Sequence, residues 1–277
     1  MTHRWAVPIA CTVFLVSCQS TALPTRIDSP IQEREWRMLA DKAIYFGHQS
    51  VGANILDGVE RLSAGSAAPT PGPKLVQSSA PEDLTAGVWM HEMIGENERP
   101  DSKISAFKDR VQNGVGERAD IAFFKLCYID INEQTNVPTL FDSYRATLES
   151  LKQQFQNTVF VHVTMPITVV QSGPRAWVKG VLGRRPWGEV ENVGRSEFNQ
   201  LMRTHFKEDP IFDLARLEST GPGGERHIYW VDSRPIEKLV PAYTSDGGHL
   251  NDTGRLHLAR SLIRFLGELP SSDATAP

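Results

Sequence analysis

Ser50 occupies a position that suits a nucleophile. Residues 43–46 read as a short buried strand, and apolar residues at helical spacing from 50 to 62 predict a helix directly after it. The hydroxyl of Ser50 is therefore expected at the carboxyl end of a strand, beside helix N–H groups that can stabilise an oxyanion. The alternative is that Ser50 only caps the helix, as serines at helix starts commonly do.

Asp246 and His249 supply what such a serine needs, although they lie near the other end of the chain. They stand three residues apart in a glycine-containing loop, just ahead of an amphipathic C-terminal helix. At this spacing the carboxylate can orient the imidazole, while the other ring nitrogen faces a distant serine. The three residue types together predict acyl transfer through a covalent intermediate.

Residues 47–50 and 246–249 together resemble the SGNH, or GDSL-type, hydrolase superfamily. In that superfamily a serine after the first strand is matched with a C-terminal Asp-x-x-His before the last helix. Gln49 departs from the pattern, because it stands where an aspartate is usual. The resemblance extends from about residue 44 to residue 266. It implies an α/β fold with three α/β/α layers, a mainly parallel five-stranded, flavodoxin-like sheet, and ester hydrolysis that needs no cofactor.

The resemblance also implies oxyanion donors in the middle of the chain. Gly95 matches the glycine that donates a backbone N–H after the second strand of the superfamily. The superfamily's Gly-x-Asn-Asp block has no asparagine here, so Tyr128 is the candidate for a replacement hydroxyl and Asp130 for the final aspartate. The alternatives are a buried core tyrosine and a loop aspartate. Cys127 is a rival nucleophile, but no base is indicated beside it, and a lone cysteine usually belongs to the core.

Strands and helices alternate along the rest of the chain. Strands are expected at 119–130, 158–164 and 210–214, with an accessory strand at 227–231. Helices are expected at 30–42 after a Ser29 cap, from 101 to 114 or 116, at 140–155, at 191–206, and after an Asn251-Asp252 cap. Residues 64–83 read as a long surface loop. This alternation predicts a parallel sheet with helices on both faces.

A basic and aromatic segment follows the strand at 158–164. Residues 165–188 contain no acidic residue, and they carry Arg175, Trp177, Lys179, Arg184, Arg185 and Trp187. A long loop beyond the carboxyl end of a strand can cover an active site, and this composition favours an anionic or sugar-like substrate. The alternative is a solvated loop that lies near anionic lipid headgroups.

The N-terminal residues read as an export signal. Residues 1–17 combine a basic start with an apolar run that is too short for a membrane span of about 20 residues. Residues 15–18 resemble a bacterial lipobox, so Cys18 is the expected lipidation site, and Gln19 favours the outer membrane. The alternative is an ordinary signal peptide with a chance cysteine. We expect a tether at 18–28, a hydrolase domain at 29–268 and a disordered tail at 269–277.

Composition limits the other classes of function. The chain has 277 residues, is 40% hydrophobic and 22% charged, and shows no internal repeat, so one catalytic domain is expected. The net charge of −4 gives no support to nucleic-acid binding. No ligand spacing supports a metal site among the candidate residues His48, His91, His162, Asp246 and His249. His162 is expected in the core, because it lies within a predicted strand.

These observations predict an exported, membrane-anchored serine esterase. Its expected substrate is an acyl ester, with a sugar O-acetyl ester as the best fit to an exported lipoprotein that has a basic aromatic loop. The same triad also suits an acyltransferase that passes the acyl group to a sugar. A third alternative is a non-catalytic surface lipoprotein that binds glycans.

Overall fold

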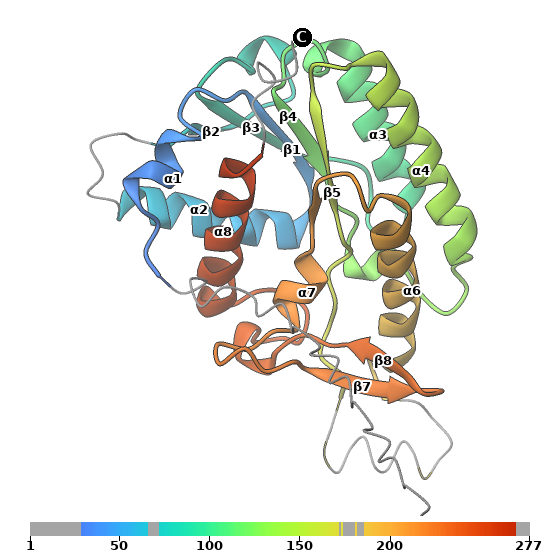
Figure 1. Cartoon of the computed structure of the whole chain (residues 1–277). Coiled ribbons are helices and arrows are strands. Elements are labelled where there is room, and N and C mark those ends of the chain that lie inside the picture. The colour runs from blue at the N-terminus through green and yellow to red at the C-terminus, as the bar shows by residue number, and fades with distance from the viewer. Residues whose placement is uncertain (1–28, 66–71, 172, 174–180, 182–185, 270–277) are drawn as a thin grey trace, which may run out of the picture.

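Six parallel strands form one central sheet with helices packed on both of its faces (Figure 1). The structure is a computed structural model, and it describes residues 29–65, 72–171, 173, 181 and 186–269. The strands are β1 (Ile44–His48), β2 (Lys74–Gln77), β3 (Val88–Met93), β4 (Ile121–Phe124), β5 (Val159–Val163) and β6 (Ile211–Phe212). Their order across the sheet is β2-β3-β1-β4-β5-β6. The predicted three-layer α/β architecture is therefore confirmed.

The sheet has one strand more than the five expected. β2 lies within residues 64–83, which we predicted to be a surface loop. It is an edge strand that pairs with β3 alone, and all four of its residues are exposed or half-buried. An edge strand of this kind carries no continuous apolar run, so the hydrophobic pattern does not reveal it.

Helices form two layers, one on each face of the sheet. One layer consists of α1 (Glu33–Arg37), α2 (Ser50–Ala64), α7 (Leu214–Glu218) and α8 (Asp252–Gly267). The other consists of α3 (Pro100–Arg110), α4 (Val137–Gln154) and α6 (Glu189–His205). Figure 1 shows α1, α2 and α8 on the left of the sheet and α3, α4 and α6 on the right.

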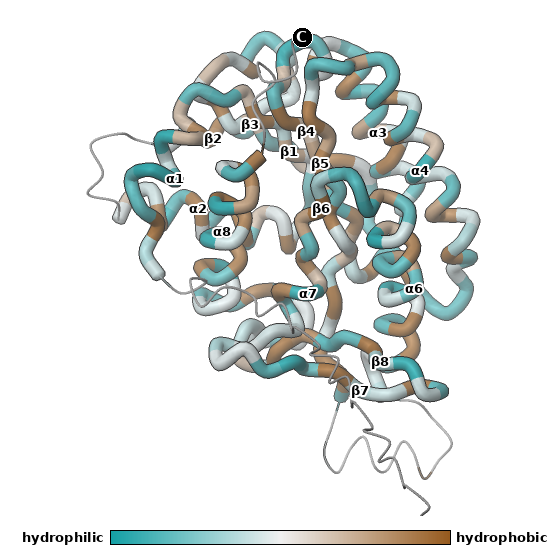
Figure 2. Tube along the Cα trace, viewed as in Figure 1, coloured by the Kyte–Doolittle hydropathy of each residue, from teal (hydrophilic) through white to brown (hydrophobic). Residues whose placement is uncertain are grey.

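Each face of the sheet has its own hydrophobic core, because side chains alternate along a strand. On the α2 and α8 side, Phe46 stacks on Phe123 with ring centroids 4.5 Å apart. On the opposite side, Phe124 stacks on Phe107 of α3 at 4.5 Å. The central strands are largely hydrophobic in Figure 2, while the flanking helices alternate between hydrophobic and hydrophilic residues.

The strand order of the sheet changes direction at β1. β3 and β2 extend the sheet from one edge of β1, whereas β4, β5 and β6 extend it from the other. In open α/β sheets, ligands bind outside the carboxyl ends of the strands at such a reversal. Ser50 follows β1, and Tyr128 follows β4. The strand predicted at 119–130 ends at Phe124, which leaves residues 125–130 free to form part of this site.

Two predicted helix caps have different outcomes. Asn251 caps α8, as predicted, by accepting the Gly254 N–H at 3.1 Å. The predicted Ser29 cap is wrong, because α1 begins four residues after Ser29 and its N-cap residue is Gln32. The Gln32 N–H donates to the Glu35 side chain at 2.6 Å. The carbonyl oxygen of Ser29 instead accepts a hydrogen bond from Arg264 of α8 at 2.7 Å, which holds this segment across the C-terminal helix.

The accessory strand predicted at 227–231 belongs to a separate antiparallel hairpin. It corresponds to β7 (Ile228–Val231), which pairs with β8 (Arg234–Glu237) below α6 and α7 in Figure 1. Asp232 and Ser233 join the strands with φ values of 47° and 61°. Positive φ at both central residues is the geometry of a type I′ turn, which matches the twist of a tight hairpin.

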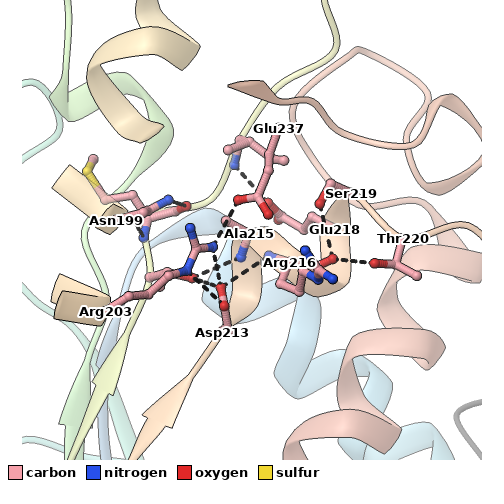
Figure 3. Close-up of polar contacts among 12 residues, drawn as sticks. Asn199, Arg203, Asp213, Ala215, Arg216, Glu218, Ser219, Thr220 and Glu237 are labelled. Atoms are coloured by element: carbon pink, nitrogen blue, oxygen red, sulfur yellow. Dashed lines mark hydrogen bonds and ion pairs between the residues drawn. The ribbon is translucent and has the colours of Figure 1, made fainter. Parts of the chain in front are cut away.

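A polar network joins this hairpin to the main domain (Figure 3). Arg203 of α6 donates two hydrogen bonds to Asp213, at 2.9 and 2.6 Å, and a third to Glu237 of β8 at 2.9 Å. Asp213 also caps α7 by accepting the Arg216 N–H at 3.2 Å. One arginine therefore connects the end of β6, α6 and the hairpin.

Among the described residues, no helix is both long and apolar enough to cross a membrane. Residues 1–28, which include Cys18, lie outside the described residues, so the export signal and the tether stay predictions. Leu269, which we assigned to the tail, packs against the core beside α8.

Candidate active site

Ser50 is the first residue of α2, and its hydroxyl faces the C-terminal loop. Gln49, and not Ser50, is the residue that precedes the helix as N-cap. The Oγ atom of Ser50 lies 3.1 Å from Nε2 of His249. Because the hydroxyl is directed to an imidazole rather than to the helix amides, the alternative that Ser50 only caps the helix is wrong.

Asp246 and His249 form the other half of the contact. The second ring nitrogen of His249, Nδ1, lies 2.7 Å from Oδ2 of Asp246. The other carboxylate oxygen accepts the N–H groups of Gly248 at 2.9 Å and of His249 at 2.8 Å. Partial burial opposes ionisation of Asp246, but these hydrogen bonds outweigh it and lower the pKa of the carboxyl below its ordinary value.

The loop that carries this pair is tied down at both ends. Gly247 has a φ of +96°, a conformation that favours glycine, and its N–H donates to Thr244 Oγ1 at 2.9 Å. The Leu250 N–H donates to the side chain of Asn54 at 3.1 Å. Asn54 lies four residues after Ser50, on the same face of α2, so one helix positions both the serine and the histidine loop. Asn54 was not among the predicted site residues, although its i, i+4 spacing from Ser50 is a sequence signal for a shared helix face.

The three side chains can perform general-base catalysis in this arrangement. If Nδ1 of His249 carries the proton, it donates to Asp246, and the lone pair of Nε2 is left to accept the proton of Ser50. The 3.1 Å separation of Nε2 and Oγ is within hydrogen-bond reach. The His249 side chain is 41% exposed and that of Asp246 is 57% exposed, so water reaches the site.

Tyr128 borders the imidazole. Its hydroxyl oxygen lies 3.4 Å from both ring nitrogens of His249, and the two rings meet edge to face with centroids 5.6 Å apart. Burial, reinforced by the nearby charge of Asp246, raises the pKa of Tyr128, so its hydroxyl keeps its proton at neutral pH. The side chain is half-buried: it packs against the core on the α2 and α8 side, and its hydroxyl borders His249, so the core alternative holds in part.

Gly95 lies in the loop after β3, at the same edge of the sheet. Its φ is +61°, and a Cβ atom there would come within 2.6 Å of the Lys103 backbone, so only glycine fits. Nε2 of Gln49 donates to the carbonyl oxygens of Ile94 and Gly95, both at 2.9 Å. No described residue accepts a hydrogen bond from the Gly95 N–H. Gln49, in the place usually held by aspartate, thus ties the Ser50 turn to the Gly95 loop.

A buried ion pair joins the Gly95 loop to the Tyr128 turn. Nζ of Lys103 lies 2.6 and 2.7 Å from the two carboxylate oxygens of Asp130, and both side chains are 0% exposed. Asp130 also accepts the N–H groups of Glu98 at 3.0 Å and Cys127 at 2.7 Å. Asp130 lies in the connection between β4 and α4, as the loop alternative expects, but it is buried and ion-paired there. Lys103 was missed, because a lysine within an amphipathic helix gives no sign of burial.

The rival nucleophile Cys127 is enclosed. It is 2% exposed, and its sulfur has Nζ of Lys125 as a neighbour at 3.7 Å. A thiol in this position offers no surface to a substrate, in contrast to the accessible Ser50–His249 pair.

The histidines considered as metal ligands do not converge at one point, although two of them are neighbours. His48 and His91 contact each other at 3.0 Å, and burial lowers the pKa of His48 to about 4, so its ring is neutral at pH 7. His162 is buried in β5, where it meets the Tyr144 hydroxyl at 3.0 Å and stacks on Phe206. Within the described part of the chain, no three metal-ligating side chains converge.

Of the six basic and aromatic residues predicted to contact substrate, the structure describes one, Trp187. Trp187 is 44% exposed and packs against the loop that carries Asp246 and His249, so that a Cβ atom on Gly247 would lie 3.1 Å from its ring. The remaining residues of that prediction lie outside the described residues: Arg175, Trp177, Lys179, Arg184 and Arg185. The structure therefore brings together Ser50, Asp246, His249, Tyr128 and Trp187 at one edge of the sheet.

No protein-family model and no curated protein matches the chain. Similar solved structures include a protein named as lipolytic and of the G-D-S-L family from Desulfitobacterium hafniense, at 9% identity and a TM-score of 0.46 over 80% of this chain and 99% of that one. An acetyl esterase variant with bound acetate is 12% identical, with a TM-score of 0.44 over 80% and 96% of the two chains. A GDSL-like lipase from Parabacteroides merdae is 15% identical, with a TM-score of 0.44 over 82% and 96%.

Proposed function

We propose that the protein is a serine ester hydrolase of the SGNH type, with Ser50 as nucleophile, His249 as base and Asp246 as the group that orients the base. The observation that carries the proposal is the continuous contact from Asp246 through His249 to Ser50, at 2.7 and 3.1 Å. Ser50 and His249, which meet in this contact, are 199 residues apart in the chain. A surface serine has no structural need for such a partner.

The reaction would proceed through an acyl-enzyme. His249 takes the proton of Ser50 while Oγ attacks the acyl carbonyl carbon, and the carbon–oxygen bond to the alcohol breaks as His249 returns the proton to the alcohol oxygen. Water, activated by the same imidazole, then attacks the acyl-serine to release the acid and free Ser50. The candidate oxyanion donors are the N–H groups of Ser50 and Gly95 and the hydroxyl of Tyr128.

The proposed substrate is a small acyl ester, with an O-acetyl group on a carbohydrate as the best candidate. The exposed indole of Trp187 beside the catalytic loop supports a sugar-like leaving group, because aromatic faces provide large apolar contacts next to polar ones. The accessible His249 and Asp246 side chains favour hydrolysis over acyl transfer to a sugar, since water reaches the base freely. An acyltransferase of the same class is the second candidate, and product analysis with added sugar acceptors separates the two.

A fluorophosphonate probe tests the proposal directly. We expect covalent labelling of Ser50, loss of labelling in Ser50→Ala, and a fall of about 10⁴ to 10⁶ in turnover of acetyl esters in His249→Ala. His205 provides a matched control, because it also pairs with a carboxylate, Glu149, at 2.7 Å on the surface. His205→Ala should retain full labelling. Equal labelling of the wild type and Ser50→Ala would show that the proposal is wrong.

We further propose that Cys18 is lipidated and that the domain is exported and anchored to a membrane, with the outer membrane as the expected site. The support is the lipobox-like segment at 15–18. Replacement of Cys18 by serine should abolish metabolic labelling with a fatty acid and release the protein from membranes. Continued labelling would contradict the assignment.

A further inference from the structure

A hollow lies between α6 and the β7–β8 hairpin, apart from Ser50, Asp246 and His249. Its volume is about 320 Å³. Ser196, Gln200 and Arg203 contribute one wall, and their i, i+4, i+7 spacing places them on one face of α6. Ile228, Pro235 and Glu237 of the hairpin contribute the opposite wall, together with Arg216 and Arg226. None of these residues belongs to the proposed catalytic site.

The hollow has an excess of positive charge. Three guanidinium groups line it, from Arg203, Arg216 and Arg226, and two carboxylates face them, from Asp213 and Glu237. No described residue forms an ion pair with the Arg216 side chain, which is exposed. Arg226 donates through Nη2 to Glu237, while its Nε and Nη1 are buried without an acceptor among the described residues. The two carboxylates therefore leave one of the three positive charges uncompensated.

An exposed aromatic ring stands beside this charge. In the register of the hairpin, Ile228 pairs with Glu237 and Trp230 pairs with Pro235, so all four side chains share one face. Three of the four line the hollow, which places Trp230 next to it, and Trp230 is 65% exposed. The opposite face of the hairpin is turned to the domain, where Ile236 is buried.

We propose that this hollow is a binding subsite for a sugar ring that carries a carboxylate or a sulfate. Arginine presents N–H donors in a fork that matches carboxylate and sulfate oxygens. The indole of Trp230 offers a flat apolar surface for the ring, and the polar side chains of Ser196 and Gln200 can bond sugar hydroxyls. This combination fits an acidic glycan unit best. An inorganic anion would make no apolar contact with the indole, and a neutral sugar would leave the positive charge of the arginines unpaired.

The subsite does not depend on the chemistry of Ser50. Ser196 lies seven residues beyond Glu189, the start of α6, which corresponds to about 10 Å of helix. A glycan unit bound here would contact α6 and the hairpin rather than Ser50. Its binding can be measured whether or not the protein hydrolyses esters.

Isothermal titration of the full chain with three kinds of oligosaccharide tests the proposal. The ligands are a uronic acid trisaccharide, a sulfated trisaccharide and the neutral trisaccharide of matching linkage, with sodium sulfate alone as a fourth. We expect at least one acidic trisaccharide to bind about 10-fold more tightly than the neutral one. Trp230→Ala and Arg216→Ala should each weaken that binding by about 10-fold, and Trp230→Phe should retain most of it. Hydrolysis of a small acetyl ester should be unchanged in all three variants.

Arg234 provides the matched control. It lies in the same hairpin and is exposed, but it shares the face of Val231 and Ile236 rather than that of Trp230. Arg234→Ala removes the same charge and should change the affinity by less than about 2-fold. Three results would each overturn the proposal: equal affinity for acidic and neutral sugars, binding of sulfate alone that Trp230→Ala does not alter, or an equal loss in Arg234→Ala. Thermal unfolding of each variant excludes a loss caused by misfolding.

Discussion

Asp246 and Asp130 have similar hydrogen-bond partners in opposite surroundings. Each carboxylate accepts two backbone N–H groups and one side-chain nitrogen, from His249 in the first case and Lys103 in the second. The Asp246 side chain is 57% exposed, whereas that of Asp130 is 0% exposed. The Asp246–His249 pair is therefore solvated at the edge of the sheet, whereas the Lys103–Asp130 pair is buried.

Because they differ in exposure, the two aspartates with similar hydrogen bonds have different roles, one at the candidate site and one in stability. Breaking a buried ion pair leaves a charge without solvent, which is strongly destabilising, whereas exposed pairs contribute little to stability. The Asp246 pair is therefore available to orient a proton acceptor without being needed for folding. The Lys103–Asp130 pair instead joins two loops at the site, those that carry Gly95 and Tyr128.

Of the substitutions that test this comparison, Asp246→Asn should produce the largest effect. It should lower the catalytic rate and leave the stability of the fold nearly unchanged. The amide can still accept the backbone N–H groups, but it no longer favours the His249 tautomer that accepts the serine proton, so turnover of acetyl esters should fall by about 10⁴. The free energy of unfolding at pH 7 should change by less than about 1 kcal/mol, because the carboxylate is exposed. Its lowered pKa stabilises the fold only above about pH 4, and this small contribution is lost as the pH falls further. Steady-state kinetics and urea unfolding measure the two quantities, and a large loss of stability would contradict the comparison.

Lys103→Met should mainly reduce the stability of the fold. The variant leaves Asp130 buried without its cation, so the free energy of unfolding should fall by about 3 to 5 kcal/mol. The double variant Lys103→Met with Asp130→Asn removes the stranded charge and should recover part of this loss. Urea unfolding of both variants measures the difference. If the single variant is destabilised by less than about 1 kcal/mol, the pair does not support the fold as inferred.

Glu218 is a third carboxyl for comparison: it is buried, and none of the described residues forms an ion pair with it. Burial raises its pKa to about 8, only partly offset by the Ile167 N–H that donates to Oε2 at 2.7 Å. The folded protein therefore binds more protons than the unfolded chain between about pH 4.5 and 8, and stability falls as the pH rises through this window. Glu218→Gln cannot ionise, so it should stabilise the protein by about 1 to 3 kcal/mol at pH 9 and hardly at all at pH 4.

Thermal unfolding of Glu218→Gln at several pH values checks this expectation. Glu225→Gln is the control, because it makes the same substitution at an exposed position. A stability difference between Glu218→Gln and wild type that stays constant from pH 4 to pH 9 would rule out ionisation as the cause.

Arg99→Ala should have the smallest effect of the four. Arg99 pairs with Glu96 at 2.7 Å, in the loop that follows Gly95, but both side chains are 66% exposed. Its removal should change the free energy of unfolding by less than about 0.5 kcal/mol. A loss comparable to that of Lys103→Met would show that contact geometry, and not burial, determines the contribution of ion pairs in this protein.

Much of the architecture and the core of the site could be predicted from local patterns. The buried runs before Ser50 and around Phe123 predicted strands, and the Asp-x-x-His spacing predicted the contact between Asp246 and His249. The errors occur where a local signal is weak. β2 is a half-exposed edge strand, and the Ser29 segment is held by Arg264 from the far end of the chain rather than by a cap.

The residues that support the site could not be predicted in the same way. Lys103 has the spacing of an ordinary helix, and its burial follows only from the position of Asp130 across the fold. Trp230 is distant in sequence from Arg203, and the hairpin register places it beside the hollow, whereas Arg216 reaches the hollow from α7. Each of these facts depends on a long-range contact, which no window of local sequence contains.

The sequence by itself determined the alternation of strands and helices, the glycine-containing turns and the residue types suited to acyl transfer. Local backbone preferences and hydrophobic periodicity govern these features. Only the tertiary structure decided that Ser50 and His249 meet across 199 residues, and that Asp130 is buried while Asp246 is exposed. Strand order and helix packing set these distances and burials, and the free energy of a charge depends on its surroundings rather than on its neighbours in the chain.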